Sequence, residues 1–150
     1  MRWAAPAAAL LACACATWVP GAQRVPDCPG SLLPAAEIPG GDFVLRARAR
    51  VEAPDVALAF ELLVERHGDR VVLVGFDAFG ARVFSVVQTG VALETDSRLG
   101  RALSIDPENL LRDLHAARFA RDRSQERTTV QRAGCHHRTT FVRVEHRELE

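Results

Sequence analysis

The sequence predicts a mainly β domain, a curved antiparallel meander of short strands with one covering α-helix, behind an N-terminal export signal. Three observations predict it. Apolar and polar residues alternate from Phe43 onward, turn residues separate the apolar runs at short intervals, and one segment after Asp106 has helical spacing. Strict alternation is typical of half-buried strands, and closely spaced strands with tight turns are typical of antiparallel sheets.

Residues 1–12 have the features of an export signal. Arg2 is followed by an apolar stretch that ends in a small residue directly before Cys13, which is the order of parts in a signal peptide. The alternative is a secretory signal that is cut later, after Ala14 or Ala22. A membrane-spanning helix would need about 20 apolar residues, and this stretch is shorter.

The composition changes twice along the chain. Residues 13–42 are rich in proline and glycine, which predicts a tether and an extended lead-in segment and not a helix. Residues 43–150 carry the strand and helix patterns and are expected to form one β domain. The formal net charge is zero, so no bulk electrostatic attraction to nucleic acid is expected.

Four cysteines are present, at positions 13, 15, 28 and 135. An exported protein meets an oxidising compartment, in which disulfides persist. Cys28 and Cys135 flank the β domain, and we expect them to form a disulfide that closes a loop of about 100 residues and contributes ~4–5 kcal/mol. Two unpaired thiols are the alternative.

The first strand is expected from Phe43 to Val51. Its alternate positions carry Arg46, Arg48 and Arg50, and alternate side chains of a strand face opposite ways. The basic row could bind RNA, but the zero net charge and the export signal favour a solvated sheet face.

The next two strands are expected at Val56–Glu65 and Val71–Phe76. A three-residue loop at 67–69, with Gly68 at positive φ, would pair Arg66 with Arg70. The apolar residues of both strands would then share one buried face, with Phe60 opposite Phe76, Leu62 opposite Val74 and Val64 opposite Val72. A four-residue loop would set Leu62 against Gly75 and is disfavoured on this argument.

The remaining elements follow from local signals. Residues 77–80 and Gly90 predict turns around strands at 83–88 and 91–95, and the chain ends with strands at 128–131 and 139–147. A helix is expected at 106–118, because Asp106 is a good N-cap, Pro107 suits the first helical position and Glu108 favours the positive end of the helix dipole.

The segment Leu10-Leu11-Ala12-Cys13 resembles the lipobox of bacterial lipoproteins. That resemblance implies that the chain is cut before Cys13 and that the thiol of Cys13 carries an acyl group. In Gram-negative lipoproteins the next residue helps to sort the protein, and Ala14 in place of aspartate implies the periplasmic face of the outer membrane.

The segment from Val72 to Phe84 is similar to the central hairpin of LolB-like outer-membrane lipoproteins. Phe79-Gly80 match the turn of that family, and Asp77-Ala78 stand where Ser-Pro is usual. Within that group, the chain looks like the small lipoproteins found beside aryl-polyene and fatty-acid-like biosynthesis genes. The resemblance covers residues 43–120 and implies an incomplete, half-open barrel wrapped over a helix.

The resemblance also implies an apolar cavity that binds or transfers acyl chains or lipidated cargo. The expected lining lies on the apolar sheet face, at Phe43, Leu45, Leu58, Phe60, Leu62, Val72, Val74 and Phe76. The sequence alone leaves open whether this space is hollow or filled. A filled core would favour a structural or protein-interaction lipoprotein.

No enzyme, cofactor or metal site is expected. Cys135-His136-His137 is the nearest approach to a metal motif, but adjacent histidines on a strand face opposite ways. No phosphate-binding loop and no nucleophile-elbow motif occurs in the sequence. His67 in a turn and His115 on the helix have structural interpretations, and the N-cap role accounts for Asp106.

Overall fold

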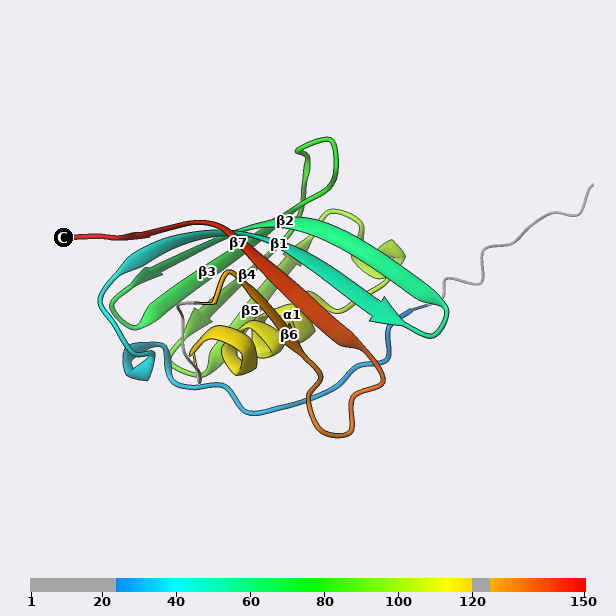
Figure 1. The fold of residues 1–150 in the computed structure, drawn as a ribbon, viewed down its shortest axis with the longest axis horizontal. Helices are drawn as coiled ribbons and strands as arrows, with labels where there is room; N and C mark the ends of the chain where they lie inside the picture. The colour runs from blue at the N-terminus through cyan, green and yellow to red at the C-terminus, as the bar shows by residue number, and fades with distance from the viewer. Residues whose placement is uncertain (1–23, 120–124) are drawn as a thin grey trace, which may run out of the picture.

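The computed structural model describes residues 24–119 and 125–150 (Figure 1). Seven strands and one α-helix account for most of this part of the chain, with short 3-10 turns at Ala35–Glu37 and Gly100–Ala102. The elements in chain order are β1 (Phe43–Ala53), β2 (Val56–His67), β3 (Arg70–Phe76), β4 (Arg82–Thr89), β5 (Ala92–Ser97), α1 (Pro107–Leu114), β6 (Arg127–Val130) and β7 (Arg138–Glu148).

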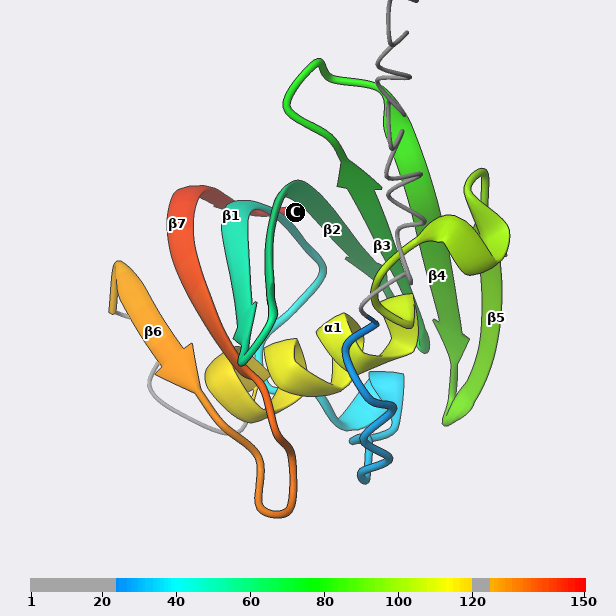
Figure 2. The same cartoon turned by 90° about the vertical axis from the view of Figure 1, so that its right-hand side faces the viewer.

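The strands form one open antiparallel sheet in the order β5-β4-β3-β2-β1-β7-β6. The sheet curls around α1, which lies against its concave face (Figure 2). The predicted fold class, a half-open barrel with one covering helix, is therefore confirmed. The sheet does not close, so β5 and β6 are left as its two outer edges.

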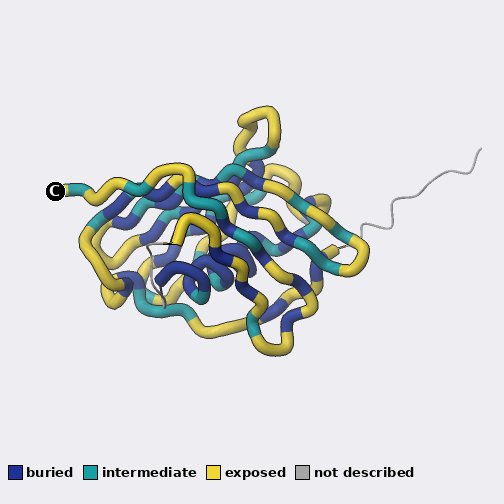
Figure 3. The backbone as a smooth tube through the Cα atoms, in the orientation of Figure 1, coloured by how far each residue is buried: buried dark blue, intermediate teal, exposed yellow. Residues whose placement is uncertain are grey.

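Strand β1 alternates between buried and exposed residues, as its sequence predicts (Figure 3). The small residues Ala47 and Ala49 face the core, while the arginine row faces solvent. Arg48 pairs with Glu61 at 2.9 Å, and Arg50 pairs with Glu52 at 3.4 Å. Carboxylates thus balance part of the row, as expected for a solvated sheet face.

The predicted register of β2 and β3 is wrong by one residue. His67 lies opposite Arg70 and Leu62 lies opposite Gly75, which is the register that the burial argument disfavoured. Val71, Leu73 and Gly75 of β3 therefore face the core. The ring of Phe84 lies over Gly75, where a Cβ atom would overlap it. This ring fills the space that Gly75, having no side chain, would otherwise leave empty opposite Leu62.

Helix α1 begins as the sequence predicts and ends four residues earlier than expected. The Asp106 carboxylate accepts a hydrogen bond from the backbone N–H of Glu108 at 3.0 Å, and Pro107 occupies the first helical position. The regular helix ends at Leu114, and a π-helical turn continues from His115 to Phe119. Within the described residues, no helix is long and apolar enough to span a membrane.

Residues 24–42 lie against the body of the domain and cross below α1 (Figures 1 and 2). We call this segment the strap. Val25, Ala35 and Ile38 are buried in the core. The buried guanidinium of Arg66 donates hydrogen bonds to the carbonyls of residues 36, 38, 40, 41 and 68, and so fixes the last turn of the strap.

Candidate functional site

The concave face, where the acyl-binding residues were expected, is buried beneath α1. Five of the eight expected residues face this interior. Four of them are buried and Leu58 is half-buried: Phe43, Leu45, Leu58, Phe60 and Leu62. The other three belong to β3 and lie half-buried on the convex face, because of the register correction: Val72, Val74 and Phe76. The expectation of one shared apolar face is therefore wrong for β3.

Side chains of the helical segment occupy the concave face. Leu110, Leu111, Leu114 and Ala117 are all 0 % exposed, and they belong to one cluster with the inward residues of the sheet. A cavity at one end of this layer measures about 20 Å³. It is lined by three aromatic or aliphatic residues, Phe43, Leu45 and Phe119, and by three polar ones, Arg118, Arg143 and His146. A cavity of that size has room for about one water molecule.

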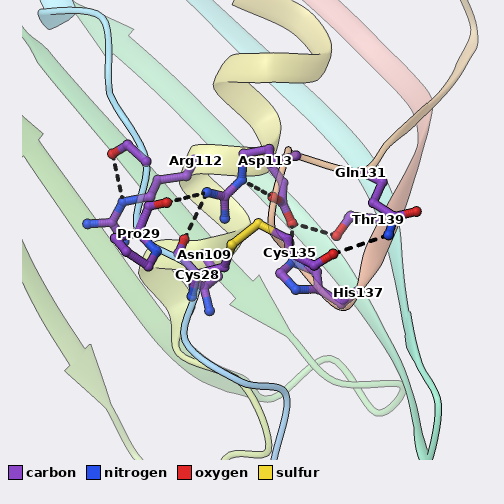
Figure 4. Close-up of polar contacts among 11 residues, drawn as sticks. Cys28, Pro29, Asn109, Arg112, Asp113, Gln131, Cys135, His137 and Thr139 are labelled. Atoms are coloured by element: carbon purple, nitrogen blue, oxygen red, sulfur yellow. Dashed lines mark hydrogen bonds and ion pairs between the residues drawn. A yellow bond between two sulfur atoms is a disulfide. The ribbon is translucent and has the colours of Figure 1, made fainter.

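The disulfide between Cys28 and Cys135 is present, as predicted (Figure 4). The two Cα atoms lie 5.6 Å apart across a sequence separation of 107 residues, which is the usual spacing for a disulfide. Both residues are buried. The bond joins the strap to the loop that precedes β7.

A buried carboxylate lies beside this disulfide. Asp113 of α1 accepts hydrogen bonds from Nε2 of His137 at 2.9 Å, from the Thr139 hydroxyl at 2.6 Å and from Nε of Arg132 at 2.5 Å (Figure 4). Burial raises the pKa of Asp113, but the hydrogen bonds from His137, Thr139 and Arg132 outweigh it and hold this pKa below its usual value. The carboxylate is therefore charged at neutral pH.

Arg132 extends this network to the strap. Its Nη1 donates to the carbonyl of Cys28 at 2.8 Å and to that of Pro29 at 3.3 Å. The backbone N–H of Cys28 donates to Oδ1 of Asn109 on α1 at 3.2 Å. One polar network thus ties α1, the strap and the start of β7 together.

Asp113, His137 and Thr139 are residue types that occur together in catalytic sites, but here all three are buried. Asp113 is 1 % exposed, His137 is 2 % exposed and Thr139 is 0 % exposed, so the three side chains are shielded from solvent in this structure. His136 and His137 face opposite ways, one exposed and one buried. In residues 24–119 and 125–150, no three histidine, cysteine or acidic side chains are grouped so that they could hold a metal ion.

His115 belongs to a second buried network on the same helical segment. The backbone N–H of Leu33 in the strap donates to its Nδ1 at 3.3 Å, so Nε2 carries the proton and donates to Oε1 of Gln88 at 2.8 Å. The Gln88 amide donates in turn to the carbonyls of Leu33 and Gly90, both at 2.7 Å. Burial lowers the pKa of His115 to about 4.

The turn between β3 and β4 stands out from the body of the domain (Figures 1 and 2). We call residues 77–81 the finger. Phe79 is 96 % exposed. The Asp77 carboxylate accepts hydrogen bonds from the N–H groups of Phe79 at 2.9 Å and Ala81 at 3.0 Å, and Gly80 adopts a φ of 78°. The finger is thus an ordered turn, stabilised by hydrogen bonds, that exposes a phenylalanine to solvent.

Sequence reasoning identified some of these residues and missed others. Phe79 was recognised only as part of a turn. The partners of Asp113, namely Arg132, His137 and Thr139, are 19 to 26 residues away in sequence. An acidic residue among the leucines of the predicted helix was the available signal. Cys13, the expected acylation site, lies outside the described residues.

The chain matches one family model. Residues 45–148 match the family described as "Protein of unknown function (DUF3261)". The match covers the sheet and α1 and begins after the strap. No curated protein shows significant sequence similarity to the chain.

Proposed function

Because the chain belongs to the DUF3261 family of proteins of unknown function, we propose a function from its own residues. It is an outer-membrane lipoprotein, acylated at Cys13, that works without catalysis at the membrane surface and binds or transfers acyl chains or lipidated cargo. The observation that carries this proposal is the exposed Phe79 at the tip of the finger. A single exposed apolar side chain is common on protein surfaces, so the proposal depends on the position of Phe79 at the tip of a protruding turn that hydrogen bonds hold in shape.

The energetics of Phe79 favour a lipid contact. A phenylalanine side chain that leaves water for an apolar phase gains roughly 1.5–3 kcal/mol. In the monomer this gain is not realised, because the side chain is 96 % exposed. The bonds from Asp77 hold the turn in shape, so little conformational entropy is lost when the tip enters a bilayer.

The length of chain between the proposed lipid anchor and the domain is compatible with this role. Nη1 of Arg24 bonds the carbonyl of Leu103, and the N–H of Val25 bonds that of Ser104. Residues 103–104 follow β5 in the chain. The end of β5 pairs with the start of β4, at the base of the finger. The 11 residue steps from Cys13 to Arg24 span up to about 36 Å when extended. The anchored domain can therefore bring Phe79 to the same bilayer.

Binding of an acyl chain would require the concave face to open. The leucines of α1 occupy the space that an acyl chain would take. A cavity of about 20 Å³ beside Phe119 is the place where an acyl chain could begin to enter. The polar contacts of Asp113 and His115 orient α1 but can be replaced by water when the helix moves. In this proposal α1 is displaced when acyl cargo enters.

The packed concave face favours a second candidate function. With α1 in place the interior is filled, so the chain could act as a protein-interaction lipoprotein that holds no ligand. The two candidates share the anchor and the finger. They differ in whether the folded protein binds an acyl ligand.

Vesicle flotation tests the role of Phe79. The chain 13–150 with Cys13→Ser, which lacks an acyl anchor, is mixed with vesicles of phosphatidylethanolamine and phosphatidylglycerol. Phe79→Asp should weaken binding by about tenfold or more. Val91→Asp is the matched control, since Val91 is 62 % exposed at the turn between β4 and β5, at the other end of β4. Equal binding of the Phe79→Asp variant and the unsubstituted chain would refute the membrane role.

A fluorescent fatty acid separates the two candidates. The acyl-handling function predicts saturable binding that strengthens in Phe119→Ala, because this change enlarges the cavity beside Phe43 and Leu45. Val72→Ala on the convex face should leave binding unchanged. If the folded protein does not bind the fatty acid in either form, the interaction function replaces the acyl-handling one.

A further inference from the structure

The unpaired strand edges of the described sheet differ in their protection. The edge strand β5 carries Glu94 and Asp96, both exposed, and the edge strand β6 has four residues and an exposed Arg127. Charged side chains and short length are the usual means by which sheet edges avoid pairing with other strands. The start of β2 pairs with β1 on one side and has no neighbour on the other. This open side has no charged side chain of its own at residues 56–60 and is not a short edge strand.

The open edge of β2 is on the side where β3 would continue if it were longer. Strand β3 reaches only as far as Phe76, opposite Glu61, so residues 56–60 extend beyond it. The turn between β1 and β2 has two residues, because Ala53 pairs with Val56. The N–H of Val56 therefore points toward β1. Backbone groups alternate in direction along a strand, so the N–H and C=O groups of Ala57 and Ala59 point toward the missing strand.

No other group in the described part of the chain occupies this edge. The backbone hydrogen bonds of residues 24–119 and 125–150 outside the strand ladders include none to Ala57 or Ala59. Both side chains are exposed and small, so they leave the backbone accessible. The stretch resembles the open edges to which extended segments add as a further strand.

An apolar groove runs beside this edge. It has a volume of about 310 Å³, and its walls include Ala49, Ala59, Phe60 and Ala78 of the finger. The charged groups at its rim have partners. Arg48 pairs with Glu61 at 2.9 Å, Arg50 pairs with Glu52 at 3.4 Å, and Asp77 accepts hydrogen bonds within the finger. The groove therefore suits an uncharged, apolar side chain and not an ion.

We propose that residues 17–19 of this chain, Thr17-Trp18-Val19, add to the free edge of β2 and place the indole of Trp18 in this groove. β-Branched and aromatic residues favour strands, and these three are the most strand-prone run between Cys13 and the strap. Successive side chains of a strand face opposite ways, so Trp18 can enter the groove while its neighbours point away from it.

The length of chain before Arg24 allows this placement. In Figure 1 the described chain starts at the same end of the sheet as the turn between β1 and β2, next to Ala57 and Ala59. Six residue steps separate Trp18 from Arg24 and span about 20 Å when extended. Docking would shorten the free tether to the few residues after Cys13 and so hold the anchor beside the finger.

The fluorescence of Trp18 tests the proposal directly. The chain 13–150 with Cys13→Ser contains one tryptophan, because the other, Trp3, precedes residue 13. The docked indole should emit at shorter wavelength than in the urea-unfolded chain and should be protected from acrylamide. This experiment needs neither lipid nor cargo, so its outcome is independent of the vesicle and fatty-acid experiments.

Two substitutions at the edge should release the indole. Ala59→Arg adds a charge at the groove, and Ala59→Pro removes the N–H that faces the missing strand while leaving the pairing with β1 intact. Both should shift the emission to that of a solvated tryptophan and raise quenching several-fold. Thr129→Pro on the outer edge of β6 is the matched control and should leave Trp18 protected.

Three outcomes would overturn the proposal. Trp18 could be as accessible in the folded chain as in urea. Its protection could persist in both Ala59 variants, which would place it elsewhere. Its protection could disappear on dilution, which would mean that the segment is donated to a second copy.

Discussion

The two buried sides of α1 and its π-helical continuation differ in chemistry. The side toward the sheet is apolar and consists of Leu110, Leu111, Leu114 and Ala117. The polar side consists of Asn109, Asp113, His115 and Arg118, whose hydrogen-bond partners lie in the strap, in β4, just before β6 and around the start of β7. Apolar burial is strong but not directional, whereas each hydrogen bond requires a particular geometry. The apolar side thus stabilises the helix without fixing its position. The polar side determines where the helix lies, and removal of one of its partners costs stability because it leaves buried polar groups unsatisfied.

Removal of Asp113 should give the largest effect. Asp113→Ala leaves the guanidinium of Arg132, the ring N–H of His137 and the hydroxyl of Thr139 without their acceptor. Loss of one partner of a buried ion pair typically costs about 3–5 kcal/mol. Leu111→Ala, on the apolar side, should cost about 2–5 kcal/mol through the cavity that it leaves. Urea unfolding measures both.

The comparison can be sharpened with a double variant. Asp113→Ala combined with Arg132→Met removes both charges, and the two changes should cost clearly less than the sum of their single effects. Additive costs would mean that the two residues act separately. A cost below about 1 kcal/mol for Asp113→Ala alone would contradict the importance of the polar side.

The His115 network predicts a dependence of stability on pH. Burial lowers the pKa of His115 from 6.5 to about 4, so the unfolded chain binds more protons between these values. Stability from His115 is therefore complete above about pH 6.5 and is lost as the pH falls toward 4, by about 3 kcal/mol in total. Asp113, with its lowered pKa, loses its charge only at lower pH and does not account for this window.

The measurement is the free energy of unfolding at pH 7, 5.5 and 4. The same series in His115→Gln should lack most of the decline between pH 6.5 and 4. An equal decline in both chains would assign the pH dependence to other groups.

The smallest expected effect concerns the register of β2 and β3. Gly75→Ala places a Cβ atom into the ring of Phe84 and should destabilise the fold by about 1–3 kcal/mol. Gly41→Ala is the control, because a Cβ atom there meets no atom within 4 Å. Thermal unfolding of the two variants tests whether the ring of Phe84 fixes the position of β3. Equal melting temperatures would refute that role.

The sequence predicted the features that depend on local pattern. The alternation in β1, the N-cap at Asp106 and the turn at Gly90 are each specified within a few residues. The register of β3 could not be predicted, because this strand is apolar on both faces and the ring that decides between them comes from β4. The disulfide could be predicted from the export signal that the sequence suggests and from the cysteine positions.

The polar side of α1 was not predictable for a related reason. Asp113, His115 and Arg118 each depend on partners in other elements, and nothing in the spacing of the chain indicates which elements meet. Phe79 was visible as a residue, but its exposure depends on the finger standing away from the sheet. Sequence pattern therefore identified the scaffold and left most of the candidate site to tertiary structure.

The strand order has a consequence for how the chain reaches its native state. Among the described strands, β1 and β7 are the one neighbouring pair that is not consecutive in sequence. Strands β1 to β5 can assemble through local contacts, which form fast, whereas the pairing of β1 with β7 must close a long loop and is slow. Cys135 lies three residues before β7, so we expect it to meet Cys28 after that pairing has formed. We therefore expect the disulfide to form late in maturation, so that it locks a finished fold and does not guide its assembly.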